Sequence, residues 1–131
     1  MPDPYRPVGL DALLGLEYSE VSGDRVVITW LVTPDHQQPY GIVHGGVYCA
    51  VVESAASIGA GLWLGERGQV VGVANQTDFL RAVGAGQLTA VATPVHRGRS
   101  QQLWTVEISD EQQRLVARGQ VRLQNLTAPS G

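Results

Sequence analysis

Two glycines and one glutamate are the residues of this chain best placed to do chemistry together. Gly45 and Gly46 stand just before a long run of small and apolar residues, Val47 to Leu64, which has the length of about five helical turns. Where a helix begins, the first N–H groups have no partner within the helix, and the helix dipole favours negative charge. Such groups can stabilise a carbonyl oxygen that becomes negative in a transition state. On spacing alone, a tight turn explains the two glycines equally well.

Glu53 lies inside the same segment, between Val51-Val52 and Ala55-Ala56, in the most apolar part of the chain. An ionised carboxylate is rarely buried without a partner, because removing it from water is costly. A glutamate that faces a cleft from such a position is a candidate catalytic group. The alternative is a structural ion pair with Arg81 or Arg122.

The spacing along this segment has two further consequences. Ser57 follows Glu53 by one helical turn, so it either assists the carboxylate or serves as a small packing residue. Gly45 and Glu53 are eight residues apart, which is about 12 Å along one helix. One small carbonyl cannot contact both within a single chain. If both act on it, two copies must pair with their helices antiparallel, and the sites lie at the subunit interface.

Charge and cysteine content limit the kinds of partner. The 131 residues include twelve acidic residues and nine basic residues, all of them arginine, for a net charge of −3. This balance argues against a nucleic-acid surface. Cys49 is the one cysteine, so no internal disulfide can form. The N-terminus has no apolar signal segment, and we expect a cytoplasmic protein. His36, His44 and His96 lack metal-ligand spacing, and we expect no metal site.

Hydrophobic periodicity predicts the elements that must position these residues. A short amphipathic turn ends at Gly15, and the apolar segment from Val47 forms one long helix. We expect one domain over residues 1–131, with a loose N-terminal arm (1–7) and a polar C-terminal tail (125–131). Strands are predicted at Leu16–Val21, Arg25–Thr33, Gln69–Arg81, Gln87–Arg97, Gln102–Ser109 and Leu115–Gln124. This order predicts an α+β fold with an antiparallel sheet wrapped around the helix. The helix is apolar nearly all round, so a second subunit is expected to cover its remaining side.

One combined pattern resembles a known family. Over about residues 8–124, the chain is similar to the hotdog-fold acyl-CoA thioesterases, and most similar to the phenylacetate-pathway and 4-hydroxybenzoyl-CoA thioesterase branch. The motif that carries the resemblance is Gly41-x-x-His44-Gly45-Gly46-Val47 followed by Glu53-x-Ala55-Ala56-Ser57. The resemblance implies the hotdog fold and the hydrolysis of an aromatic or a short- to medium-chain acyl-CoA to the free acid and CoA.

The resemblance also implies roles for individual residues. Glu53 matches the catalytic carboxylate, as nucleophile or as general base, and the Gly45 N–H matches the group that polarises the thioester. Gln38 matches a loop glutamine near the thioester, and Ser57 stands where other members orient the nucleophile or water. The resemblance assigns substrate contacts to His44 and Gly46, with a loop-fixing role for His44 favoured over that of a general base. The strand that carries Asn75, Thr77 and Phe79 is expected beside the acyl pocket.

The turn Arg97-Gly98-Arg99-Ser100 resembles the place where family members hold the CoA phosphates. Two arginines that flank a glycine in a tight turn offer guanidinium and N–H donors suited to phosphate. A solvated hairpin tip is the alternative for this turn.

Three other functions remain open. A non-catalytic acyl-CoA-binding or sensing module could use the same fold, and a small-molecule binder could use Glu53 only structurally. An enoyl-CoA hydratase is disfavoured, because the adjacent Asp35 and His36 do not resemble the hydratase pattern. For the thioesterase we expect a homodimer or a homotetramer built as a dimer of dimers, no cofactor beyond the CoA of the substrate, and neither nucleic acid nor membrane as a partner.

Overall fold

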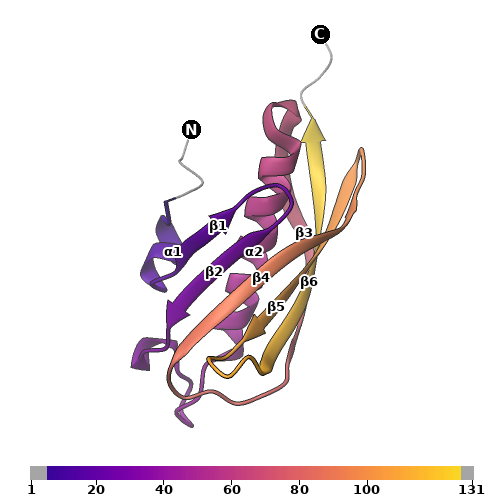
Figure 1. The fold of residues 1–131 in the computed structure, drawn as a ribbon. Coiled ribbons are helices and arrows are strands. Elements are labelled where there is room, and N and C mark those ends of the chain that lie inside the picture. Colours follow the sequence, from indigo (N-terminus) through magenta and orange to yellow (C-terminus); the bar gives the residue numbers. More distant parts are fainter. Residues whose placement is uncertain (1–5, 128–131) are drawn as a thin grey trace.

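A single antiparallel sheet arches over one long helix (Figure 1). The computed structural model describes residues 6–127. The elements are α1 (Gly9–Leu13), β1 (Glu17–Val21), β2 (Val26–Leu31), η1 (Pro34–His36), α2 (Gly45–Leu64), η2 (Gly65–Arg67), β3 (Gly68–Phe79), β4 (Gln87–Arg97), β5 (Gln101–Ser109) and β6 (Leu115–Thr127). The predicted α+β architecture, a sheet wrapped around one central helix, is confirmed.

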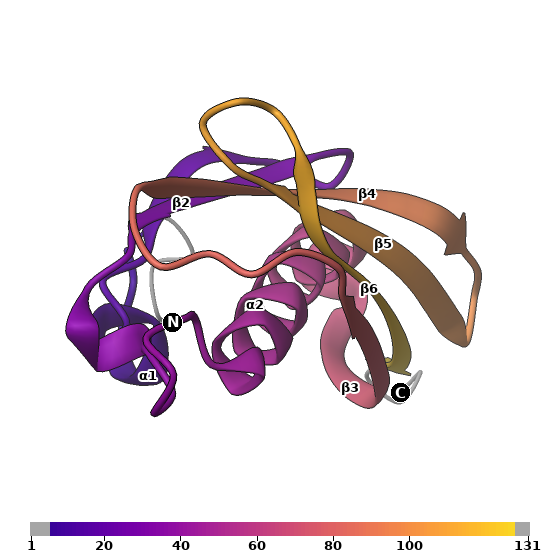
Figure 2. The ribbon, with the colours of Figure 1, turned by 90° about the horizontal axis from the view of Figure 1, so that it is seen from below.

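The six strands are ordered β1-β2-β4-β5-β6-β3 in the sheet. β3 follows α2 in the chain but lies at the far edge of the sheet, and within residues 6–127 it pairs with β6 alone. Seen end-on, the sheet curves over α2 and β3 comes down along the flank of the helix (Figure 2). The fold therefore brings β3 and α2 side by side and leaves β3 with one unpaired edge.

The core lies between the concave face of the sheet and one side of α2. Successive strands contribute alternate residues, because side chains along a strand point to opposite faces. Small residues on the helix let the sheet approach closely: a Cβ added at Gly59 would lie 2.6 Å from the Trp104 indole. The fully buried side chains include Val26, Ile28, Trp30, Val51, Val52, Leu88, Trp104, Val106, Ile108, Val121 and Leu123.

The opposite side of α2 is only partly covered. Cys49, Glu53, Ser57 and Ile58 keep intermediate exposure, whereas Val51, Val52, Ala55 and Ala56 have none. The segment 45–67 is long and apolar enough to cross a membrane, but half of its apolar window is buried inside the fold. Burial to that extent is typical of a core helix, and one flank of this helix remains open.

The predicted polar tail is wrong over its first three residues. β6 continues to Thr127, and Asn125 is only 6% exposed. Its Nδ2 donates to the carbonyls of Gly98 (3.0 Å) and Arg99 (3.2 Å), and its Oδ1 accepts from Gln102 Nε2 at 2.9 Å. An inward amide is tolerated because these bonds satisfy it. Residues 1–5 of the predicted arm and 128–131 of the tail lie outside the described residues.

Candidate active site

The N-terminus of α2 is capped by a histidine side chain. His44 Nδ1 accepts the Gly46 N–H at 2.7 Å, which extends the helix back to Gly45, two residues before the predicted start. The cap engages His44 Nδ1 and the Gly46 N–H, which is consistent with a structural role for His44 and leaves its Nε2 exposed. The substrate contacts expected of His44 and Gly46 stay a prediction. In residues 6–127, the Gly45 N–H has no acceptor. It is therefore the first-turn donor available to a ligand, as the sequence predicts.

A cavity of about 310 Å³ lies beside this helix end. Gln38, Gly45, Tyr48 and Phe79 line it, together with Ile42, Val43, Leu80, Arg81, Ala82 and Val83. The Gln38 Oε1 accepts the Tyr40 N–H, which orients the amide and leaves its NH₂ group as a donor. Phe79 packs on the Gly45 Cα, since a Cβ there would lie 2.5 Å from the ring. Three residues from separate parts of the predicted site, Gln38, Gly45 and Phe79, thus meet in one cavity.

Tyr48 forms part of the same wall and is 3% exposed. Its ring centroid lies 6.0 Å from that of Phe79, with the ring planes tilted by 34°. Burial raises the pKa of the Tyr48 hydroxyl to about 12, so the group is a neutral hydroxyl at physiological pH. Across residues 6–127 this hydroxyl has no hydrogen-bond partner.

Glu53 is half-buried, and it is held by neutral side chains. Its Oε1 accepts from Asn75 Nδ2 at 3.3 Å, and Ser57 Oγ lies 3.5 Å from Oε2, the long limit of a hydrogen bond. No salt bridge within the described chain involves Glu53, and Arg81 and Arg122 are exposed elsewhere. The structural ion pair considered from the sequence is therefore wrong. The carboxylate is available to act on a substrate or on water.

Asn75 and Thr77 position this carboxylate in the single chain. Thr77 Oγ1 donates to Asn75 Oδ1 at 2.8 Å, and Asn75 Nδ2 also donates to the Cys49 carbonyl at 3.0 Å. The structure shows a hydrogen-bonded chain from β3 to the helix that orients Glu53. The substrate contacts that the sequence predicts for these two residues stay a prediction.

Sequence reasoning missed Gly72, on which the carboxylate rests. A Cβ at this position would lie 2.1 Å from Glu53 Oε2. The register of β3 against β6 shifts between Gly72 and Ala74, which leaves Val73 as a β-bulge. Bulges are common beside active sites because they redirect side chains. A glycine within an apolar strand run was the available signal, since it marks a bulge or a close approach.

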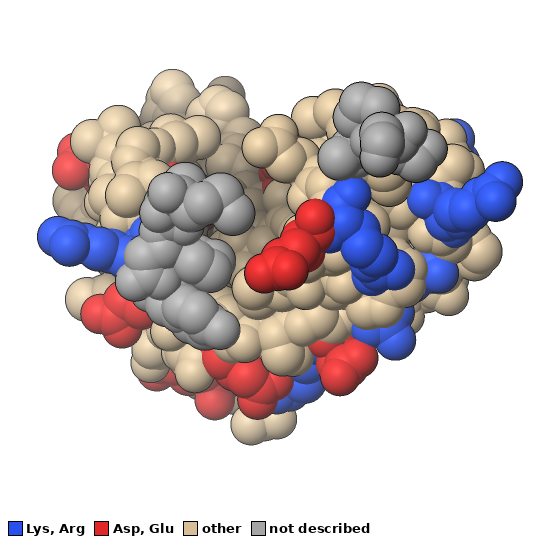
Figure 3. All heavy atoms as spheres, turned by 90° about the horizontal axis from the view of Figure 1, so that it is seen from above, with Lys and Arg blue, Asp and Glu red and all other residues tan. Residues whose placement is uncertain are grey.

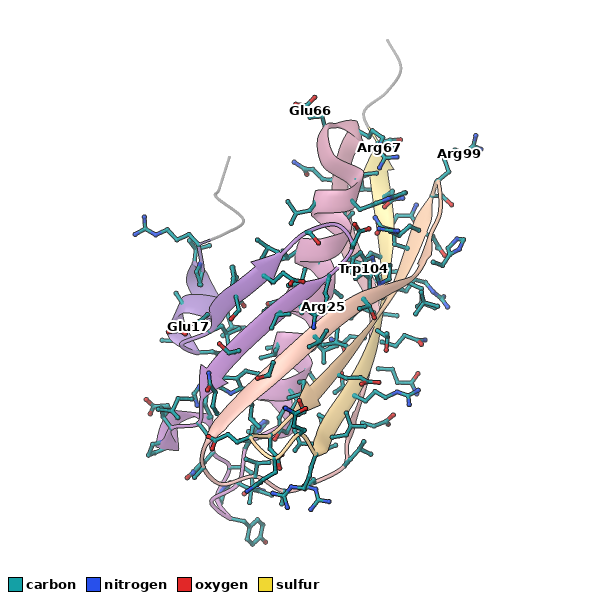
Figure 4. All side chains as sticks on the ribbon, in the orientation of Figure 1. Glu17, Arg25, Glu66, Arg67, Arg99 and Trp104 are labelled. Carbon is teal, nitrogen blue, oxygen red and sulfur yellow. The ribbon has the colours of Figure 1, made fainter. Side chains whose placement is uncertain are left out.

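Hydrogen bonds hold the turn from Arg97 to Ser100, and one of its arginines is already engaged. Arg97 Nη1 donates to the Gly23 carbonyl (2.7 Å) and pairs with Asp24 (2.8 Å). The Gly98 N–H donates to the Gln101 carbonyl at 2.8 Å, so it is not free for a phosphate. Arg99 is exposed and projects from the hairpin tip, at the end of the molecule that also carries Arg67 (Figure 4).

The end face of the molecule carries an uneven charge. Viewed from above, most of the basic side chains lie on the right half of the surface, with one more at the left edge and an acidic patch beside them in the centre (Figure 3). Two residues of the predicted phosphate-binding turn, Arg99 and Ser100, are exposed at the tip of the β4–β5 hairpin.

Comparison with known proteins identifies the family. The model of the thioesterase superfamily matches residues 40–117, which include the helix cap, α2 and β3. The chain belongs to the thioesterase superfamily. The predicted hotdog fold and the predicted thioester hydrolase are confirmed, and the specific branch within the superfamily stays a prediction.

The similarity to known proteins covers most of the length of this thioesterase. "Putative esterase Rv1847" of Mycobacterium tuberculosis is 50% identical over 97% of this chain and 96% of that protein. The 1,4-dihydroxy-2-naphthoyl-CoA hydrolase of Listeria monocytogenes is 36% identical over 83% of this chain and 89% of its own. The crystal structure of AziG from S. sahachiroi is 54% identical with a TM-score of 0.92, covering 94% of this chain and all (100%) of that one.

Proposed function

We propose that this thioesterase hydrolyses an acyl-CoA, with an aromatic or a short- to medium-chain acyl group, to the free acid and CoA. The observation that carries the proposal is the Glu53 carboxylate, which neutral groups hold in place without a cationic partner. A carboxylate in that setting can serve as a base or a nucleophile. The name of the Listeria relative, a naphthoyl-CoA hydrolase, supports an aromatic acyl-CoA.

The donors in the cavity suggest how the thioester would be held. Its carbonyl oxygen would accept from the Gly45 N–H and the Gln38 amide, which line the same cavity. Glu53 would then either remove a proton from the attacking water or attack the carbonyl itself. The second route gives a mixed anhydride with Glu53, which water then hydrolyses to the free acid and the carboxylate. The C–S bond breaks and CoA leaves as a thiolate, which needs little acid assistance. We propose that the reaction needs no metal or organic cofactor. We also propose that the protein is cytoplasmic.

We further propose a homodimer whose sites lie between subunits. Glu53 does not line the cavity that holds Gly45, and the two residues are about 12 Å apart along α2. The open edge of β3 and the open flank of α2 lie together. β3 exposes Val71 and Val73 (44% and 55%), an apolar strand edge of the kind that pairs with another chain. A two-fold axis there would bring Glu53 of one copy to the cavity of the other. Two such dimers would form the predicted tetramer.

Arg99 and Ser100 are proposed to contact the CoA phosphates. Both are exposed on a turn held by hydrogen bonds, and Arg99 is free of ion pairs within residues 6–127. Arg97 would support the turn through Asp24 instead of binding phosphate directly. A guanidinium is a strong phosphate donor.

The proposed reaction is tested by thiol release from a panel of acyl-CoAs. Glu53→Gln keeps the shape of the side chain and removes its charge, and we expect kcat to fall by about 10²–10⁴. Glu66→Gln is the matched control, because Glu66 is exposed just beyond the same helix. Full activity in a folded Glu53→Gln variant would refute the proposed role. Binding of acyl-CoA without hydrolysis would favour the binding module.

The position of the site between subunits is tested by complementation. A Gln38→Ala chain and a Glu53→Gln chain are inactive separately if each site needs both residues. Co-expressed, they form mixed dimers in which one site carries both changes and the other carries neither. Random mixing should then restore about a quarter of the native activity. Sites contained in one chain would show no restoration.

A further inference from the structure

The hydroxyl of Tyr48 is a buried polar group that the proposed reaction does not use. In the part of the chain that the structure describes, it is one of two buried side-chain polar atoms without a hydrogen-bond partner; the other is Trp30 Nε1. A buried hydroxyl that is left unpaired destabilises the folded state, so native proteins keep few of them and each needs an explanation.

Tyr48 lies where an acyl group would extend. Gly45 and Gln38, the proposed donors to the thioester carbonyl, line the same cavity as Tyr48. Tyr48 is three residues after Gly45 on α2 and so lies one turn deeper along the helix. The remaining wall is mostly apolar, with Ile42, Val43 and Val83 among its residues. Arg81 is the charged residue of the lining. A substrate held at its carbonyl would therefore extend its acyl group along a mostly apolar wall that includes Tyr48.

Phe79 explains how a ligand could reach this hydroxyl. Its ring lies against that of Tyr48 at 6.0 Å and is itself 56% exposed. Exposed side chains change rotamer within nanoseconds, so Phe79 can move aside while Tyr48 stays fixed by burial. The cavity volume of about 310 Å³ is at the small end of ligand sites, which favours a compact acyl group.

We propose that Tyr48 determines substrate specificity by hydrogen bonding to an oxygen substituent, a hydroxyl or a keto group, on the acyl part of the substrate. The inference rests on the proposed function, since it concerns the same site. A hydroxyl both donates and accepts, so either substituent satisfies it. The oxygen substituent is carried either by an aromatic ring or by a short aliphatic chain, and its hydrogen bond to Tyr48 is the same in both cases. A site built to bond such a group discriminates against the analogue that lacks it, because its own polar atom is then left unpaired.

The test compares matched substrate pairs in the native protein and in Tyr48→Phe. One pair is benzoyl-CoA with its ring-hydroxylated forms, and the other is butanoyl-CoA with 3-hydroxybutanoyl-CoA and 3-oxobutanoyl-CoA. We expect the native protein to favour an oxygen-bearing member in kcat/KM by about tenfold or more. Tyr48→Phe should bring that ratio close to one while kcat/KM for the plain member stays within threefold. The substrate pair that shows this preference identifies whether a ring or a chain carries the oxygen substituent.

Tyr40→Phe is the matched control. It makes the same chemical change on a tyrosine that is 90% exposed and does not line the cavity. The substrate ratio should not change in this variant. Tyr48→Phe should also unfold at the same temperature as the native protein or higher, because it removes an unpaired hydroxyl. A lower melting temperature would mean that the hydroxyl already has a partner, such as an ordered water, and would contradict the inference.

Failure of the inference differs from failure of the proposed function. Hydrolysis with the same substrate ratio in native and Tyr48→Phe proteins refutes only the role of Tyr48. If no acyl-CoA is hydrolysed, the proposed function fails, and calorimetric binding of benzoate and hydroxybenzoates, and of butanoate and 3-hydroxybutanoate, decides the inference separately. Equal affinity of the plain and hydroxylated acids for the native protein would refute it.

Discussion

Replacing Gly72 with alanine should abolish most activity and leave the fold intact. The Cβ that this change adds would lie 2.1 Å from Glu53 Oε2, whereas real Cβ contacts are essentially never shorter than 3.0 Å. The backbone at Gly72 does not adopt a positive φ, so alanine is compatible with the strand. The three heavy atoms nearest to the new Cβ all belong to the Glu53 carboxylate, so the conflict is with the end of one flexible side chain.

The magnitude follows from how far the carboxylate must move. Glu53 Oε2 has to retreat by about 1 Å, and its contacts with Asn75 (3.3 Å) and Ser57 (3.5 Å) are already long. A shift of this size breaks both contacts and misplaces the reacting oxygen, which costs about 10²-fold in rate. The free energy of unfolding should change by less than about 1 kcal/mol, because a rotamer change relieves the contact and alanine restricts the unfolded chain.

The assay is kcat by thiol release, with urea unfolding measured on the same samples. Gly61→Ala is the control, because the same change on α2 brings the new Cβ no closer than 3.8 Å to Val70. It should keep native activity and raise stability slightly, as alanine favours a helix. If Gly72→Ala keeps kcat within threefold of the native value, the position of Glu53 over β3 does not matter for catalysis and the reasoning is refuted.

Two further predictions concern stability. His44→Ala removes the cap on Gly46 and should lower the free energy of unfolding by about 1 kcal/mol, whereas His44→Asn, which can cap, should lose less; equal losses in urea unfolding would contradict the cap. Burial raises the pKa of Tyr48 from 10.0 to about 12, so the unfolded chain loses this proton first, and the free energy of unfolding falls as the pH rises from 10 through 12. Unfolding measured across this range should show a steeper loss for the native protein than for Tyr48→Phe, and parallel curves would refute the shift.

Local patterns were sufficient to predict the elements of the fold. The predicted strand Gln87–Arg97 coincides with β4, and the helix from Val47 differs from α2 only at its start. Side-chain periodicity reports which face of an element is buried, and short polar turns mark the ends. Strand order is different, because it depends on which edges meet in space. Nothing local to β3 shows that it pairs with β6.

The candidate site was predicted in part, and the reasons differ between residues. Glu53 was recognisable because a carboxylate in an apolar helix is costly. The partners that hold it lie on β3, more than twenty residues later, so their contact is a property of the fold. The sequence predicts a phosphate contact for Arg97 because two arginines flank a glycine in a tight turn. In the structure Arg97 forms an ion pair with Asp24, which lies in the turn between β1 and β2 and is distant from Arg97 in the sequence. Asn125 looked like part of a tail because polar residues follow it.

Because β6 lies between β5 and β3, the sheet of this enzyme cannot be completed until β6 has been synthesised. Within residues 6–127, β3 has no other neighbour in the sheet, and β6 is the last strand. β3 must therefore wait for a segment made more than thirty residues later, and closing so long a loop slows its docking. Until residues 115–127 leave the ribosome, the helix carries Glu53 without the strand that orients it. If Glu53 acts as proposed, a nascent chain, or one truncated before β6, should not hydrolyse thioesters until β6 is in place.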